Sequence, residues 1–136
     1  MPKEISAGMI VYNPKLEKFL ILEYESHWGF VKGNMEAGEK EEETSQRELK
    51  EETGIVDFTF VKDFKEKIDY FYKKENKTVY KEVVFFLILT KSEVVKLSNE
   101  HKSYKWADYK EAYKLVKFKN TRNILKKAEE YITKGL

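Results

Sequence analysis

The sequence contains no cysteine and no long hydrophobic run. Disulfide bonds, zinc–thiolate sites and a thiol nucleophile are therefore excluded. Histidine is almost as scarce, with only His27 and His101. The longest apolar run, Val83–Leu89, is far shorter than the roughly 20 residues of a membrane-spanning helix, and the N-terminus lacks the basic-then-apolar plan of a secretion signal. We therefore predict a soluble, cytoplasmic protein with no membrane partner.

Proline and glycine are also scarce, with two and six residues respectively. No stretch rich in proline, glycine or serine marks a linker between domains. A chain of 136 residues of which 41% are hydrophobic can bury one substantial core. We predict a single domain that spans residues 1–136, with a heavily charged surface because 37% of the residues are Asp, Glu, Lys or Arg.

Four β-prone segments are predicted to be strands: residues 5–12, 18–24, 58–72 and 79–90. A turn at Asn13-Pro14 joins the first two segments, and the polar residues 73–77 join the other two, so two hairpins are expected. Because residues 79–90 are nearly all apolar, that strand should lie centrally in the sheet. Residues 29–31 form a short extended piece between the two hairpins.

Helical segments lie between and after these strands. Residues 40–52 lack proline and glycine and are rich in helix formers, and Gly54 is placed to end this helix. After a brief strand at residues 104–106, the pair Asp108 and Glu111 forms a capping-box pattern, and a final helix begins at about Thr121. We therefore predict the α/β class, with a mixed sheet covered on two faces.

The segment of residues 33–55 carries eight glutamates against three basic residues, leaving about +7 for the rest of a chain whose net charge is +2. Glu48, Glu51 and Glu52 stand at i, i+3 and i+4, so a helix places them on one face. Leu49 is the only large apolar residue of this helix, so burial offers little to offset the repulsion. Clustered carboxylates suit Mg²⁺ or Mn²⁺ better than zinc. On composition alone, an ordinary solvated helix face is the alternative.

The spacing within this segment decides between the two interpretations. It follows the pattern G-x5-E-x7-R-E-U-x-E-E-x-G-U, where U is a bulky aliphatic residue, and it matches at all nine specified positions from Gly33 to Ile55. In this pattern the chain resembles the Nudix hydrolases. The resemblance implies the Nudix α/β/α sandwich, with a mixed β-sheet flanked by helices and the motif of residues 33–55 folded as loop, helix and loop. It also implies a divalent metal, Mg²⁺ or Mn²⁺, bound by Glu48, Glu51 and Glu52.

Arg47 is one of only two arginines against twenty-four lysines, which indicates that a planar, bidentate donor is needed at this position. The resemblance implies that Arg47 orients a catalytic glutamate, which is either Glu48 or Glu51, and that Glu39 ties the loop. The alternative for Arg47 is an i,i+4 ion pair with Glu51 on a solvated surface.

Outside this motif, three stretches resemble one branch, the asymmetrically cleaving bis(5′-nucleosyl)-tetraphosphatases, also called diadenosine tetraphosphate hydrolases. Residues 27–33 (HWGFVKG) are similar to H-W-x-x-x-K-G, although Phe30-Val31 replaces a commoner proline-containing pair. Residues 97–106 (LSNEHKSYKW) are similar to L-S-x-E-H-x-x-Y-x-W, and residues 111–119 (EAYKLVKFK) to E-A-x-x-L-x-x-F-K.

The likeness to this branch implies further site residues. It places His27, Lys32 and Lys81 on the polyphosphate, Tyr70 and Phe118 against the bases, and Glu100 near the metal. Lysines that bind phosphate and aromatic faces that stack on bases suit such a substrate. Four of these residues also have a structural alternative: a solvated loop glutamate for Glu100, an edge-strand lysine for Lys81, and ordinary packing for Tyr70 and Phe118. His101 is interpreted as a loop packing residue.

We therefore predict metal-dependent hydrolysis of diadenosine tetraphosphate to ATP and AMP, by attack of water at phosphorus. The expected partner is this small molecule, and the chain is expected to be a monomer. One alternative is a pyrophosphohydrolase acting on 5′-triphosphate RNA or altered nucleoside triphosphates. Another is a non-catalytic nucleotide- or RNA-binding Nudix module, whose usual mark, erosion of the motif, is missing. Without an arginine-rich face, no stable nucleic-acid partner is predicted.

Overall fold

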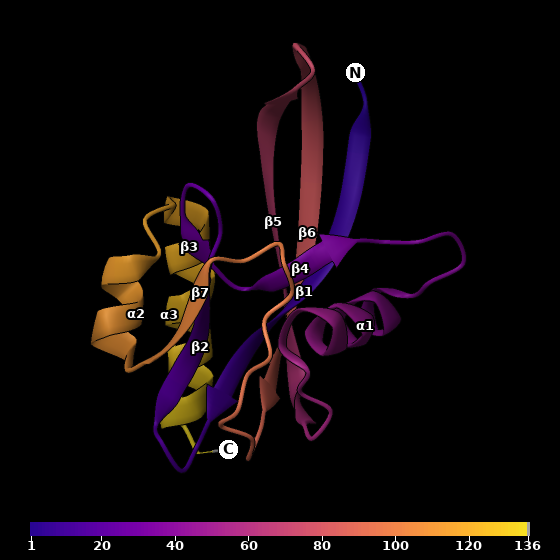
Figure 1. The fold of residues 1–136 in the computed structure, drawn as a ribbon. Helices are drawn as coiled ribbons and strands as arrows, with labels where there is room; N and C mark the ends of the chain where they lie inside the picture. The colour runs from indigo at the N-terminus through magenta and orange to yellow at the C-terminus, as the bar shows by residue number, and fades with distance from the viewer. Residues whose placement is uncertain (136) are drawn as a thin grey trace.

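A seven-stranded mixed sheet forms the centre of the molecule, which the computed structural model describes for residues 1–135 (Figure 1). Across the sheet lie β3 (Trp28–Gly29), β2 (Lys18–Glu23), β1 (Lys3–Asn13), β6 (Lys77–Leu89) and β5 (Thr59–Lys74), while β4 (Val31–Asn34) pairs with β1 and β7 (Ser103–Ala107) pairs with β2. Strands β1 and β6 are parallel, and the other pairs are antiparallel.

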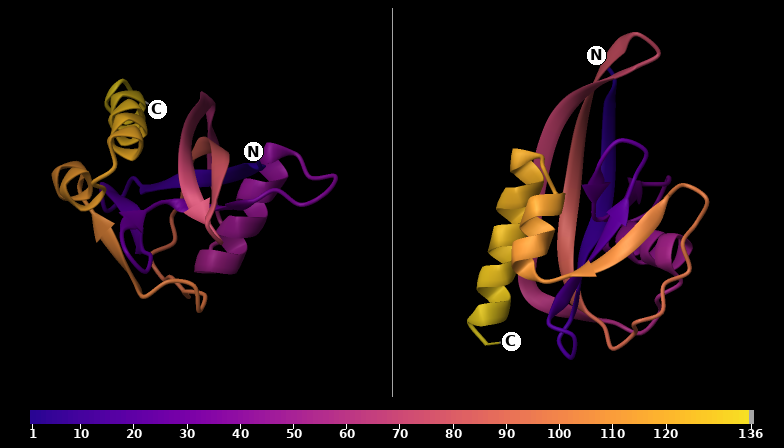
Figure 2. Two further views of the ribbon diagram at one scale, coloured as in Figure 1. Left: turned by 90° about the horizontal axis from the view of Figure 1, so that it is seen from above. Right: turned by 60° about the vertical axis from the view of Figure 1, so that its left-hand side comes forward.

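Helices cover both faces of this sheet. Helix α1 (Glu41–Thr53) lies on one face, and α2 (Tyr109–Leu115) and α3 (Lys119–Thr133) lie on the other (Figure 2). The side chains of β1 alternate between two buried clusters: Ile10 packs with residues of α3, and Met9 packs with Leu49 of α1. A strand covered on both faces needs apolar residues at consecutive positions, as β1 has. The predicted α/β/α sandwich is confirmed.

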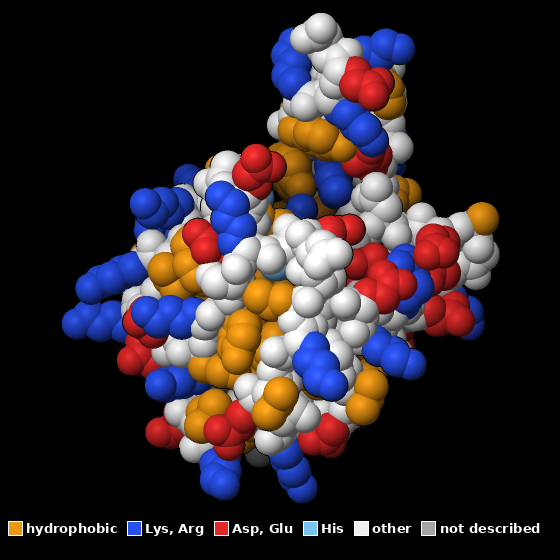
Figure 3. Space-filling view, in the orientation of Figure 1, with side chains coloured by type: hydrophobic (Ala, Val, Ile, Leu, Met, Phe, Trp, Pro, Cys, Tyr) orange, Lys and Arg blue, Asp and Glu red, His pale blue; other side chains and the backbone are white. Residues whose placement is uncertain are grey.

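The long hairpin of β5 and β6 projects beyond the body of the sheet, next to the N-terminal end of β1 (Figures 1 and 3). As predicted, the apolar strand β6 is interior, between β1 and β5. The predicted turn of residues 73–77 was too long: only Glu75 and Asn76 connect the strands. Both have positive φ, 50° and 65°, the backbone that two-residue hairpin turns require.

Helix α1 begins and ends within one residue of the predicted bounds. At its start, the Glu43 carboxylate accepts a hydrogen bond from the Lys40 backbone N–H at 2.8 Å. At its end, Gly54 adopts φ 74° and its N–H binds the Lys50 carbonyl, a left-handed cap that favours glycine. Only Leu49 anchors the helix with a large apolar side chain, and it is fully buried.

The C-terminal helices follow the predicted order with two differences. Only half of the capping box forms at α2: Asp108 accepts from the Glu111 N–H at 2.8 Å, but the Glu111 carboxylate pairs with Lys105 at 2.7 Å instead. Helix α3 begins at Lys119, two residues before the predicted start. No helix within residues 1–135 has both the length and the apolar composition needed to cross a membrane.

We expect Leu49→Ala to lower the free energy of unfolding by about 2–5 kcal/mol, because it removes the one large apolar anchor of α1 and leaves a cavity. Urea denaturation measures the change. Val56→Ala is the control: Val56 follows the same helix but is 68% exposed, so its loss should stay within about 0.5 kcal/mol. A loss below about 1 kcal/mol for Leu49→Ala would show that α1 is held by other contacts.

Candidate active site

Arg47 is the centre of a polar network that joins α1 to the loop before it. Its guanidinium forms a bidentate pair with Glu39, with Nε to Oε2 at 2.7 Å and Nη2 to Oε1 at 3.0 Å. Nη1 also donates to Glu48 Oε1 at 2.8 Å and to Glu51 Oε2 at 3.3 Å, and Nη2 donates to the Asn34 carbonyl at 3.0 Å. The i,i+4 pair with Glu51 exists, but it is the longest of these five contacts. Arg47 is therefore more than a solvated surface pair.

Glu39 closes the loop against the helix. Its Oε1 accepts from the Glu36 backbone N–H and from the Thr44 hydroxyl, each at 2.8 Å, in addition to Arg47. The hydrogen bond from Arg47 is the main cause that lowers the pKa of Glu39 from 4.5 to about 2. Hydrogen bonds to the charged form stabilise it in this way. The loop thus depends on an ionised Glu39.

Glu48 lies between Arg47 and strand β4, where it leaves no room for a side chain on Gly33. A Cβ placed on Gly33 would lie 2.1 Å from Cδ of Glu48. Glycine at this position therefore lets the helix carboxylate approach the strand closely. This contact explains physically why the motif begins with glycine fifteen residues before Glu48.

Glu52 is the most deeply buried carboxyl group of α1, with 2% exposure. Its Oε1 has no hydrogen-bond partner within residues 1–135, and neither has Nε2 of His101, which lies 3.3 Å away in an orientation that makes no hydrogen bond. Burial raises the pKa of Glu52, and the nearby carboxyl groups of Glu48 and Glu100 raise it further. His101 is buried, as its interpretation as a packing residue predicted, but the sequence did not reveal that it lies beside this carboxyl group. Only its position next to Glu100 pointed to the site.

The remaining predicted ligands lie around this pair. Glu51 is exposed on α1, facing Arg47, and Glu100 lies on the loop before β7, near enough to influence Glu52. Among residues 1–135, no three acidic or histidine side chains already form a metal cage. The donor set nevertheless fits a divalent cation: it consists of carboxylates, which hard ions prefer, and it includes a buried oxygen without a partner.

A pocket of about 760 Å³ opens between β4, the β5–β6 hairpin and the start of α3. The structure brings all five predicted substrate-binding residues together in its lining: His27, Lys32, Tyr70, Lys81 and Phe118. They come from separate stretches of the chain. Trp28 and Tyr72 also line the pocket; neither was predicted as a site residue.

Aromatic rings and two lysines face each other in this pocket. His27 and Phe118 meet edge to face at 5.3 Å between ring centroids, and Phe118 is 57% exposed. Lys32 Nζ donates to the Tyr70 hydroxyl at 3.3 Å. Burial lowers the pKa of Lys32, while Glu52 acts in the opposite direction, so Lys32 links the pocket to the carboxylates of α1. Lys81 lies on an interior strand, so its interpretation as an edge-strand lysine is wrong.

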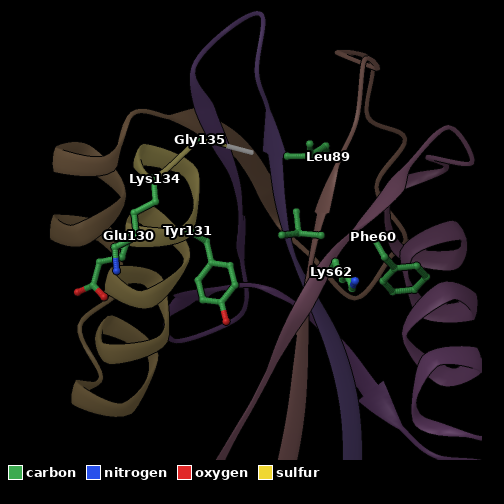
Figure 4. Close-up of a pocket in the computed structure, with 8 residues that line it drawn as sticks. Phe60, Lys62, Leu89, Glu130, Tyr131, Lys134 and Gly135 are labelled. Atoms are coloured by element: carbon green, nitrogen blue, oxygen red, sulfur yellow. The ribbon is translucent and has the colours of Figure 1, made fainter.

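A second pocket, of about 620 Å³, lies between the C-terminal end of α3 and strands β5 and β6 (Figure 4). Phe60, Leu89 and Tyr131 give it a largely apolar lining, and Lys62, Glu130 and Lys134 also line it. None of the predicted site residues lines it. The candidate active site is therefore the acidic face of α1 together with the larger pocket.

Comparison with known proteins identifies the family of the chain. The profile of the NUDIX domain matches residues 2–128. The asymmetrical bis(5′-nucleosyl)-tetraphosphatase of Mus musculus is 30% identical over 142 residues, which cover 93% of this chain and 94% of that protein. An RNA pyrophosphohydrolase of a Nitratiruptor species is 32% identical over 134 residues, with coverages of 90% and 86%.

Solved structures agree with the sequence relatives. A crystal structure of a C. elegans Ap4A hydrolase binary complex matches with a TM-score of 0.84 and 29% identity, covering 96% of this chain and 98% of that one. The chain belongs to the Nudix family and is a Nudix hydrolase similar to asymmetrical Ap4A hydrolases. Members of this family generally need a divalent metal.

The lowered pKa of Glu39 predicts a specific loss of stability in acid. Because its folded-state pKa of about 2 lies below the usual 4.5, the ionised carboxylate stabilises the fold above about pH 4.5, and this stabilisation disappears as the pH falls towards about 2. Urea denaturation at several pH values should therefore show a steeper decline for the wild type than for Glu39→Gln. Glu42→Gln, which changes an exposed glutamate in the first turn of α1, should keep the wild-type slope. Equal slopes for all three proteins would contradict the ion pair.

The close approach of Gly33 to Glu48 predicts that Gly33→Ala displaces the carboxylate without unfolding the protein, because the end of the Glu48 side chain can rotate. We expect Mn²⁺ affinity to fall about tenfold in titration calorimetry, the usual cost of disturbing the surroundings of a metal ligand. Gly29→Ala is the control, since its Cβ would meet its nearest neighbour at an ordinary 3.5 Å. Unchanged Mn²⁺ affinity in Gly33→Ala would remove Glu48 from the metal site.

Proposed function

We propose that this Nudix hydrolase cleaves diadenosine tetraphosphate asymmetrically to ATP and AMP, with Mg²⁺ as its preferred ion. The observation that carries the proposal is the position of the larger pocket. It combines two partly buried lysines with aromatic rings, and it adjoins the carboxylates of α1 through Lys32. A long polyphosphate with a base at each end needs this combination: cationic contacts along the chain, stacking surfaces for a base, and a reaction centre at one side.

In this proposal, the basic residues of the pocket contact the phosphates and its aromatic residues contact a base. Lys32 and Lys81 bind phosphate oxygens through their ammonium groups, and His27 is a third contact of the polyphosphate. Tyr70 and Phe118 present ring faces to a base; the high exposure of Phe118 leaves its ring free to stack. These contacts fix the register of the polyphosphate, and so decide which anhydride bond lies beside α1.

The acidic face of α1 holds the metal through Glu48, Glu51 and Glu52, with Glu100 from the loop before β7. A bound Mg²⁺ supplies charge neutralisation at the phosphate oxygens and lowers the pKa of water. Arg47 fixes both Glu48 and Glu51 through Nη1, so it positions either carboxylate to accept the proton of the attacking water. Glu39 acts one step further away, because its bidentate pair fixes the guanidinium itself.

A second candidate function is the removal of pyrophosphate from 5′-triphosphate RNA. The specific observation in its favour is the RNA pyrophosphohydrolase relative, which is 32% identical over most of both chains. The same lysines and carboxylates would serve a terminal triphosphate. The two functions differ in their products, so they can be separated directly.

With diadenosine tetraphosphate and Mg²⁺, we expect ion-exchange chromatography to show ATP and AMP in equal amounts. EDTA should abolish turnover, because the acidic helix then repels the substrate. Glu51→Gln should lower kcat by about 10²–10⁴-fold, whereas Glu42→Gln, a matched change on the same helix, should not.

Three outcomes would contradict this proposal. Release of two ADP molecules would show that the same substrate is cleaved symmetrically, and rapid release of pyrophosphate from 5′-triphosphate RNA with no action on the dinucleotide would favour another substrate. An unchanged rate in Glu51→Gln would instead argue against catalysis by this helix.

A further inference from the structure

Glu4 lies behind the larger pocket on β1, in contact with three side chains of the β5–β6 hairpin. Its Oε1 accepts from the Tyr72 hydroxyl at 2.5 Å, its Oε2 accepts from Lys74 Nζ at 3.3 Å, and Lys81 Nζ lies 3.8 Å from Oε1. Strand register places Glu4 opposite Lys81, and Lys81 opposite Tyr70. Glu4 therefore shares a sheet face with the phosphate-binding lysine.

A carboxylate is unexpected beside a pocket for a polyanion. The hydrogen bond from Tyr72 is the main cause that lowers the pKa of Glu4, so Glu4 is charged at neutral pH. Within residues 1–135, Glu4 is the one carboxylate in ion-pair distance of Lys81, whose side chain is only 13% exposed. A largely buried ammonium group needs such a partner while no phosphate is bound.

The opposite face of the same strands carries a matching cluster, whose residues line neither of the two pockets described above. Glu82 accepts from the Tyr80 hydroxyl at 3.2 Å, and it pairs with Lys3 at 3.5 Å and with Lys67 at 3.4 Å. Both clusters contain one glutamate, one tyrosine and two lysines, and the second also includes Asp69, which accepts from the Tyr80 hydroxyl at 2.8 Å. Cross-strand pairs of this kind stabilise a sheet, so Glu82 provides the purely structural comparison.

We propose that Glu4 is a counter-anion, which holds Lys81 in the free enzyme and competes with the polyphosphate for it. This inference rests on the proposed function, because it takes Lys81 as a phosphate contact. Glu4 is a positioning residue: it acts through Lys81 and Tyr72 and does not touch the reacting atoms. Its charge lowers the affinity of the pocket for the polyanion.

The sign of the expected effect distinguishes this role from direct binding. Glu4→Gln keeps an acceptor for the Tyr72 hydroxyl but removes the negative charge. The free protein then has Lys81 without its carboxylate and should melt at a lower temperature. A polyphosphate would bind more tightly, by about tenfold, since one repulsive charge near a partly buried site is removed. If Glu4 instead bound the ligand directly, its replacement would weaken binding.

Titration calorimetry with inorganic tripolyphosphate, with and without Mg²⁺, tests the inference independently of hydrolysis. We expect Glu4→Gln and Glu4→Ala to bind about tenfold more tightly than the wild type, and Glu4→Asp, which keeps the charge, to stay within about twofold of it. Glu82→Gln should lower the melting temperature of the free protein to a similar extent but leave the dissociation constant unchanged. Thermal melts verify that each variant is folded.

The outcomes separate the two levels of inference. If the wild type binds tripolyphosphate but the folded Glu4 variants bind it equally or more weakly, the counter-anion role is overturned and the proposed function stands. If Glu82→Gln tightens binding as much as Glu4→Gln, the effect is one of general charge, and the role of Glu4 is again overturned. If neither the wild type nor any variant binds tripolyphosphate under either condition, Lys81 is not a phosphate contact and this inference is overturned, while the hydrolysis assay with diadenosine tetraphosphate decides the proposed function separately.

Discussion

The bidentate pair between Arg47 and Glu39 is the interaction on which the rest of the site depends. Through it, a loop with little apolar content is fixed against a helix whose only large apolar anchor is Leu49. The same guanidinium fixes Glu48 and Glu51. Rigidity in this region therefore comes from charged hydrogen bonds, which are stronger than neutral ones and directional. A planar group with five donors suits several carboxylates at once, and a lysine ammonium does not.

Much of this arrangement could be predicted because local rules and a fixed spacing both determine it. The bounds of α1 follow from an uninterrupted run of helix formers and from Gly54, and the interior position of β6 follows from its apolar residues. The turn at Glu75 and Asn76 was misjudged because polar residues on both sides extend the two strands, and polarity alone does not separate an exposed strand end from a turn. Only one of the two hydrogen bonds of the capping box at Asp108 forms, because the Glu111 carboxylate pairs with Lys105 on the preceding strand instead.

The places of Glu4, Tyr72 and His101 could not be read from the sequence, for a different reason. Each acts across the sheet or between loops, and its partner lies far away along the chain: Tyr72 meets Glu4 across 68 positions. No local period or spacing encodes such a contact. The five substrate-binding predictions came from resemblance, and the fold supplies what resemblance does not, namely the one pocket that they share. Physical reasoning from residues alone left Tyr70 and Phe118 as ordinary packing residues.

Strand β1 is hydrogen-bonded both to β4, which carries Lys32 and Gly33, and to β6, which carries Lys81. The pairing register of β1 with these two strands therefore fixes the position of Lys32 relative to Lys81. A slip of one residue along β1 would turn its side chains to the other face and would shift the two lysines relative to each other. Insertions should thus be tolerated at the tip of the β5–β6 hairpin but not within β1, so evolution can lengthen the projecting arm without altering the distance between the two lysines.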